Sequence, residues 1–136
     1  MKKILLALIA TLTILSCSRD NDTEAATENL AGRWNWKSSY SGLEGSLVTP
    51  ESSGKTIILE FTSKRLKYYE NDQLVSEHTY TIQKKKDAFG NDKKMIVYQP
   101  YRQEETYVVQ DDKLVLTNQT MMDGATSEYI KVKTGE

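Results

Sequence analysis

From residue 30 onward, hydrophobic and polar residues alternate along much of the chain with a period of two. The first such run places four residues on one face, namely Trp34, Trp36, Ser38 and Tyr40. This period is expected of a strand that buries one side. Aromatic side chains on that side would reach deep into a core, because each buries about 150 to 250 Å². We therefore predict a first strand over residues 33–40.

Seven further short runs follow the first one. The longest places a second set on one face, namely Leu74, Ser76, His78, Tyr80 and Ile82. Turn pairs such as Asn71-Asp72 and Asp111-Asp112 separate the runs, and no window shows a convincing helical period. The eight predicted strands are 33–40, 56–62, 65–70, 74–83, 94–99, 105–110, 113–118 and 126–133. Between the first two, the glycines and the proline of Ser41 to Lys55 predict a loop.

Short sequential strands joined by tight turns favour an up-and-down antiparallel meander, which loses its exposed edges by closing. The predicted fold is therefore all-β, an eight-stranded antiparallel barrel over residues 30–136. Such a barrel is just wide enough to be filled by its own side chains or to hold one small ligand. The inward candidates are bulky, so we expect a mostly filled interior with at most a shallow pocket at the open end. They are Trp34, Trp36, Leu59, Phe61, Tyr68, His78, Tyr80, Ile96, Tyr98, Tyr107, Leu114, Leu116 and Ile130.

The beginning of the chain has a different pattern. A basic start, Met1-Lys2-Lys3, precedes an apolar run from Ile4 to Leu15 that only two threonines interrupt. The run is shorter than the roughly 20 residues of a transmembrane helix, so residues 1–16 are predicted to be a secretory signal peptide. Ser18 to Asn29 is polar and partly acidic, and it is predicted to be a flexible tether.

Cys17 follows the signal directly and is the only cysteine of the chain. Ile14-Leu15-Ser16-Cys17 resembles the lipobox of bacterial lipoproteins. The resemblance implies cleavage before Cys17, a diacylglyceryl thioether on its sulfur and an acyl group such as palmitate on the new amino terminus. More than one acyl chain is needed for stable anchoring, because each buried methylene contributes about 0.8 kcal/mol. The alternative is an ordinary secreted protein with an unused thiol.

The residues after the cysteine bear on the destination of such a lipoprotein. Ser18 resembles the residue found in lipoproteins that are sent on to the outer membrane. Asp20 and Asp22 loosely resemble the acidic residues that direct some lipoproteins to the outer surface. We therefore expect the protein in the cell envelope, lipid-anchored in the outer membrane, either periplasmic or surface-exposed.

A second resemblance covers roughly residues 30 to 133. Gly32-Arg33-Trp34 at the start of the first strand, the eight strands and a closing strand with Tyr129-Ile130-Lys131-Val132 resemble the small lipocalin-like lipoproteins of Gram-negative bacteria, within the calycin group. In lipocalins a basic residue of the last strand packs over that tryptophan at the closed end of the barrel. This chain offers Lys131 or Lys133 for the role.

Charge and composition argue against several function classes. With 18 Lys and Arg against 19 Asp and Glu, loss of Lys2 and Lys3 with the signal leaves a net charge of about −3. A mildly acidic surface is unfavourable for nucleic acid, so no nucleic-acid partner is expected. His78 is the single histidine, and no paired ligand spacing predicts a metal or other cofactor.

Enzyme chemistry also lacks its parts, and no catalytic residue is predicted. No nucleophile-elbow sequence is present. Glu104 and Glu105 are strand neighbours that point to opposite faces, so they make no acid/base couple, and solvated charge is their expected role. For His78, a hydrogen-bonded strand residue is the preferred interpretation over a ligand contact or a proton-transfer group.

Three function classes therefore stay open besides the membrane attachment through Cys17, and an enzyme is the least expected of them because its parts are missing. In the first, the barrel mouth binds a small apolar or amphipathic molecule, and candidate contacts are Trp34, Trp36, Tyr68, His78, Tyr80, Tyr98 and Tyr107. In the second, loops such as Ser41 to Gly54 and Asp87 to Lys94 bind an envelope protein, as in an inhibitor or accessory subunit. A cavity on the order of 300 Å³ would favour the first class. A solid interior with an exposed apolar patch would favour the second.

Overall fold

The computed structural model describes residues 29–119 and 124–134. The predicted signal peptide, Cys17 and all but the last residue of the predicted tether lie outside the described residues. The elements are β1 (Gly32–Ser41), β2 (Ser46–Val48), α2 (Pro50–Ser53), β3 (Ile57–Phe61), β4 (Arg65–Glu70), β5 (Gln73–Lys86), β6 (Asp92–Gln99), β7 (Glu104–Gln110), β8 (Lys113–Asn118) and β9 (Thr126–Lys131). All eight predicted strands are present, with bounds that differ by at most three residues.

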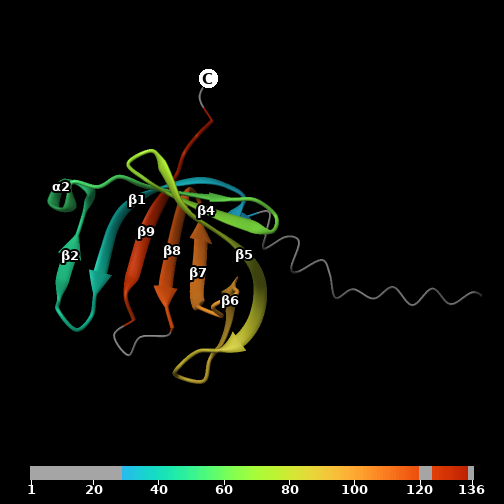
Figure 1. Ribbon diagram of the computed structural model, residues 1–136. Helices are drawn as coiled ribbons and strands as arrows, with labels where there is room; N and C mark the ends of the chain where they lie inside the picture. The colour runs from blue at the N-terminus through green and yellow to red at the C-terminus, as the bar shows by residue number, and fades with distance from the viewer. Residues whose placement is uncertain (1–28, 120–123, 135–136) are drawn as a thin grey trace, which may run out of the picture.

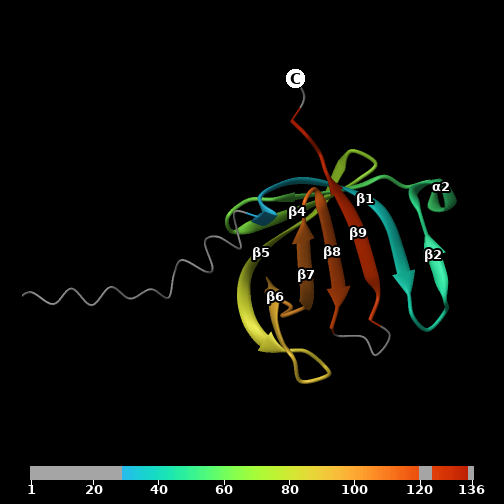
Figure 2. The same ribbon diagram turned by 180° about the vertical axis from the view of Figure 1, so that it is seen from behind.

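The strands close into an antiparallel barrel, which confirms the predicted fold (Figure 1). Neighbours in the ring follow the order β1-β3-β4-β5-β6-β7-β8-β9, and β9 pairs back onto β1. The view from behind shows β1, β9, β8 and β7 side by side in the wall (Figure 2). Closure pairs the last strand with the first and so removes the sheet edges that an open meander would expose.

The segment after β1 is more ordered than the predicted loop. β2 pairs with the end of β1, outside the ring of eight, with Tyr40 opposite Leu47. α2 follows at once and is capped at its start, because the side chain of Thr49 accepts from the backbone N–H of Ser52. A three-residue strand and a four-residue helix are too short to produce a readable period, which is why the sequence pattern missed both.

A β-bulge changes the inward face of β1. The pairing of β1 with β9 shifts register between Trp36 and Ser38. One extra residue in a strand moves the residues after it to the other face. Ser39, opposite Ser127, therefore follows Trp36 inward, and Tyr40 is 48% exposed. The prediction that Ser38 and Tyr40 share the inward face of Trp34 and Trp36 is therefore wrong.

A second register shift separates Leu74 from the inward face of β5. Tyr68 pairs with Ser76, but the next residue, Tyr69, pairs with Leu74, so Val75 is the extra residue. Leu74 is consequently 52% exposed, and the prediction that it shares a face with Ser76 is wrong.

The core fills much of the barrel and is dominated by large side chains. Its buried members are Leu30, Trp34, Trp36, Leu59, Phe61, Leu66, Tyr80, Ile96, Tyr98, Leu114, Leu116 and Tyr129. Ile130 was expected to face inward, but its neighbour Tyr129 holds that position, opposite Trp36 and Leu114. Since neighbouring strand residues face opposite sides, the prediction for Ile130 is wrong.

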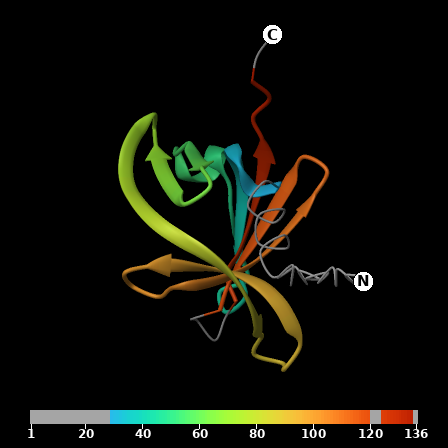
Figure 3. The same cartoon turned by 90° about the vertical axis from the view of Figure 1, so that its right-hand side faces the viewer.

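β5 is the longest strand and belongs to two parts of the wall. Gln73–Thr79 pairs with β4, and Thr79–Lys86 pairs with β6. Its curved course between the two is visible from the side (Figure 3). Within the described part of the chain, no strand pairs with the other edge of β5 before Thr79. The segment that joins β6 to β7 lies beside it, because the Tyr101 ring contacts the His78 ring.

Candidate functional site

One region of the interior is packed around Trp34. The indole Nε1 of Trp34 donates to the carbonyl of Leu30 at 2.8 Å, and both residues are completely buried. Lys131 Nζ lies over the same ring, 5.3 Å from its centroid, which is a cation–π distance. Lys133 instead pairs with Asp112. The basic residue that the lipocalin resemblance implies over the tryptophan is therefore Lys131.

Gly32 makes room for this contact. Its φ is +122°, a conformation that side-chain-bearing residues rarely adopt. A Cβ at this position would lie 3.3 Å from Cε of Lys131. The spacing Gly32-Arg33-Trp34 thus has a physical reason, because the lysine that covers the indole passes over a residue without a side chain.

Tyr80 and Phe61 extend this packed region. Their rings meet edge to face, with centroids 5.4 Å apart. The Tyr80 hydroxyl donates to the carbonyl of Thr62 at 2.5 Å. Burial raises the pKa of Tyr80 to about 12, with a smaller contribution from Tyr107. We call Leu30, Trp34, Phe61, Tyr80 and Lys131 the Trp34 cluster.

A second region of the interior is a cavity of about 190 Å³. Seven of the eight ring strands contribute to its lining. The lining residues are Leu59, Leu66, Tyr68, Ser76, His78, Tyr98, Gln103, Glu105, Leu116 and Tyr129. We call it the Glu105 cavity. Ser76 and His78 come from the part of β5 that precedes its pairing with β6, and Gln103 comes from the segment before β7.

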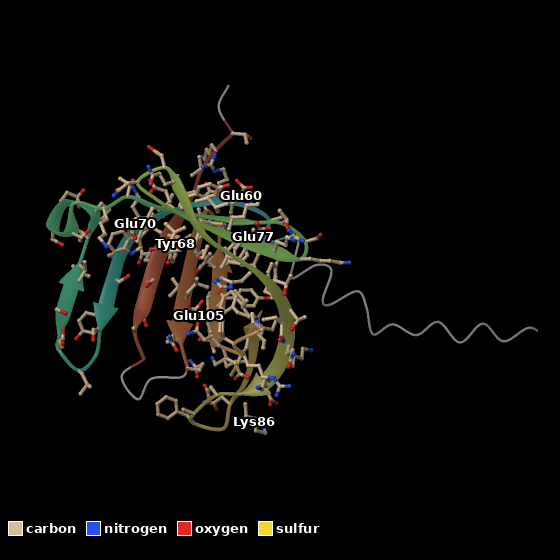
Figure 4. All side chains as sticks on the ribbon, viewed as in Figure 1. Glu60, Tyr68, Glu70, Glu77, Lys86 and Glu105 are labelled. Atoms are coloured by element: carbon tan, nitrogen blue, oxygen red, sulfur yellow. The ribbon has the colours of Figure 1, made fainter. Side chains whose placement is uncertain are left out.

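Glu105 is the one acidic residue in the lining. Tyr98 donates its hydroxyl to Oε2 of Glu105 at 2.6 Å. Burial raises the pKa of Glu105, and the hydrogen bond from Tyr98 lowers it by less. Burial, and then the charge of Glu105, raises the pKa of Tyr98 well above its usual value. Tyr68 and Glu105 are labelled on the ribbon in Figure 4.

The rim of the cavity is aromatic and polar. The rings of His78 and Tyr101 meet edge to face at 6.4 Å, and Tyr101 is largely exposed. Burial, and then the charge of Glu70, raises the pKa of Tyr68. Apolar walls with a few convergent polar groups are the usual composition of a small-molecule site.

The predicted ligand contacts divide between the two regions. Tyr68, His78 and Tyr98 line the Glu105 cavity. Trp34 and Tyr80 belong to the Trp34 cluster. The remaining two, Trp36 and Tyr107, pack in the core next to lining residues but do not line the cavity themselves.

Tyr107 has a feature that its sequence position does not reveal. Its hydroxyl is buried and has no hydrogen-bond partner among the described residues. Burial raises the pKa of that hydroxyl. An unpaired buried hydroxyl costs about 1 to 3 kcal/mol, so Tyr107 weakens the core at this point.

The sequence pattern missed two other participants in the cavity, Glu105 and Tyr129. The expectation that Glu105 carries solvated charge is wrong, whereas Glu104 does face outward, where it pairs with Lys85. The signal was present, because Tyr107 was expected to face inward and Glu105 lies two residues before it in the same strand. Tyr129 was missed because its neighbour Ile130 was assigned the inward position.

Comparison with known protein families and with curated proteins finds no match for this chain. In the described ranges, no helix has the length and apolar character needed to cross a membrane. The same residues contain no group of three or more His, Cys, Asp or Glu side chains placed to hold a metal ion.

Proposed function

We propose that this protein is a lipid-anchored envelope lipoprotein whose lipocalin-like barrel binds one small amphipathic molecule. The observation that carries the binding role is the Glu105 cavity, which has apolar walls and a rim of tyrosine and histidine. Its volume is below the 300 Å³ of an ordinary drug-sized site. A cavity of about 150 Å³ nevertheless suffices for benzene, so the ligand is about the size of a single ring.

The anchoring part of the proposal depends on the amino-terminal sequence. The apolar run Ile4 to Leu15 and the lipobox-like residues before Cys17 support export and acylation. Metabolic labelling with an alkyne-bearing fatty acid tests this in a bacterial host. We expect label on the full chain in the outer-membrane fraction and none on Cys17→Ala. Equal labelling of the two chains would refute acylation at this position.

The binding part is tested on the full chain purified in a non-ionic detergent. Native mass spectrometry should show an additional mass from a co-purified small molecule, or from an added one such as benzyl alcohol. Ser76→Leu places a larger side chain in the cavity and should abolish the adduct. Ser53→Leu, on α2 and away from the cavity, is the matched control. An adduct that persists in Ser76→Leu would show that binding occurs elsewhere.

A second candidate function is supported by the β1–β2 hairpin. Leu43, in the turn between the two strands, is 75% exposed. Leu47 is 61% exposed and lies on β2, which pairs only with the end of β1. Exposed apolar residues next to a free strand edge suit a protein partner. The accessory or inhibitor role would use this hairpin and need no ligand. Photo-crosslinking from position 47 in cells, compared with position 67 on β4, would test it: a specific adduct at 47 alone is expected.

A further inference from the structure

Glu105 differs from the acidic residues on the outside of the barrel. Seven of those have a cationic partner, in the pairs Arg33–Glu60, Lys55–Glu70, Arg65–Glu77, Lys85–Glu104, Lys86–Asp92, Lys113–Glu128 and Lys133–Asp112. Glu105 has only the neutral hydroxyl of Tyr98 as a partner within the described chain. The described lining of its cavity contains neither lysine nor arginine. A carboxylate therefore faces the cavity without a counter-charge.

A carboxylate in such surroundings is unfavourable unless it is paired or protonated. Tyr98 occupies Oε2 of Glu105, and Oε1 accepts no hydrogen bond from the described residues. Oε1 is thus available to a donor that enters the cavity. A donor that carries a positive charge would satisfy both the hydrogen-bond acceptor and the charge at once.

The other walls of the cavity suit the same charge. Tyr68, Tyr98 and Tyr129 line it together with His78. The faces of aromatic rings carry negative potential and attract ammonium groups, and such contacts strengthen when the site is shielded from water. The apolar members Leu59, Leu66 and Leu116 would contact the hydrocarbon part of the ligand. About 190 Å³ leaves space for one ring or a short alkyl chain besides the ammonium group.

We propose that the Glu105 cavity binds a small protonated amine, with Glu105 as counter-ion and hydrogen-bond acceptor and with tyrosine rings around the ammonium group. This inference rests on the proposed binding function and specifies its ligand class. An amine with at least one N–H is required, because the free oxygen of Glu105 needs a donor.

The test compares benzylamine with benzyl alcohol, which has nearly the same size and shape but no charge at neutral pH. Binding to the full chain in non-ionic detergent is measured by isothermal titration calorimetry. We expect benzylamine to bind at least about tenfold more tightly than benzyl alcohol. This comparison needs no variant, so it does not depend on the folding of an altered protein.

Two variants locate the preference. Glu105→Gln keeps an acceptor for the Tyr98 hydroxyl but removes the charge, so the preference for benzylamine should disappear while the affinity for benzyl alcohol stays within about twofold. Glu104→Gln removes the neighbouring charge on the outer face, where it pairs with Lys85, and should leave both affinities unchanged. Circular dichroism establishes that both variants are folded.

The outcomes separate this inference from the proposed function. If the wild-type protein binds both probes equally, or if Glu105→Gln keeps the preference, the amine inference is overturned while the binding function stands. If neither probe binds, and native mass spectrometry finds no other small molecule, both are overturned. If Glu104→Gln loses the preference as well, the effect comes from surface charge, and the inference fails.

Discussion

The Trp34 cluster and the Glu105 cavity share one barrel interior but use aromatic residues in opposite ways. Around Trp34, each ring is in contact with a specific protein group, whether the Leu30 carbonyl, the Lys131 ammonium group or the Phe61 ring beside Tyr80. Around Glu105, tyrosine and histidine rings surround empty space and a carboxyl group that lacks a cation. The comparison teaches that one set of side chains closes the barrel and the other leaves room for a ligand.

The two regions should differ most in how much stability is lost when an aromatic side chain is replaced by alanine. Trp34→Ala removes a fully buried indole with all its contacts and should lower the free energy of unfolding by about 3 to 5 kcal/mol. Tyr68→Ala should cost only about 1 to 2 kcal/mol, because one side of Tyr68 already faces the cavity. Urea unfolding measures both. Equal losses would mean that the cavity wall is as tightly packed as the Trp34 cluster.

The backbone beneath the Trp34 cluster provides the next test. Gly32→Ala should lower the free energy of unfolding by about 2 kcal/mol, because φ is +122° and the new methyl group would press on Lys131. Gly45→Ala has a positive φ but open space around it, and it should cost about 1 kcal/mol. Thermal unfolding compares them. A loss at Gly45 that equals or exceeds the loss at Gly32 would contradict the close-approach argument.

The charge in the cavity gives a pH-dependent difference. Burial raises the pKa of Glu105 above its usual 4.5, so the folded state holds this proton more tightly than the unfolded state. The stability contributed by the protonated form is complete below pH 4.5 and is lost as the pH rises through the folded-state pKa. Glu105→Gln should therefore be more stable than wild type at pH 7, by about 1 kcal/mol, with the gain vanishing in acid.

Urea unfolding of wild type and Glu105→Gln from pH 4 to pH 8 measures this difference. Glu104→Gln, on the outer face of the same strand, is the control and should show no comparable gain. A gain that grows toward low pH would have the wrong sign for a carboxyl group with a raised pKa.

The smallest expected effect comes from filling the cavity. Ser76→Val adds apolar volume where space exists and should raise the free energy of unfolding by about 0.5 kcal/mol. Ser127→Val removes the hydroxyl that is 2.7 Å from the Ser39 hydroxyl, and it should lower stability by about 1 kcal/mol. Chemical unfolding distinguishes the signs, and destabilisation by Ser76→Val would indicate that the cavity cannot accept a larger side chain.

Period-two patterns predicted the barrel well because every second residue of a strand faces the interior. Eight runs of alternating residues therefore predicted eight strands. The period-two rule predicted the wrong face where a strand contains a β-bulge, that is, one extra residue relative to its partner strand. At Ser38 and at Leu74 a bulge changes the face, and nothing in the alternating pattern of either strand marks the extra residue. The sequence also placed Tyr68, His78 and Tyr98 in the interior, and all three line the cavity.

Glu105 was missed for a different reason. An acidic residue is usually exposed, and that preference outweighed the strand alternation, which placed it with Tyr107 on the inward face. The cavity itself depends on how side chains from seven strands fit together, which no local pattern contains. Where polarity and periodicity disagree, as at Glu105, the disagreement marks a position that packing alone does not explain.

The short pairing between β6 and β7, which we call the β6–β7 joint, affects how a small molecule could enter the interior. Three residue pairs join these strands, whereas eight join β5 to β6 and six join β7 to β8. Local opening requires less free energy where fewer backbone hydrogen bonds must break. Amide protons along this joint should therefore exchange with deuterium before those of the other strand pairs of the ring, which are joined by at least four residue pairs each. Transient opening of the β6–β7 pairing would let a small molecule enter through the barrel wall. The residence time of a bound molecule would then depend on the rate of this opening as well as on the affinity.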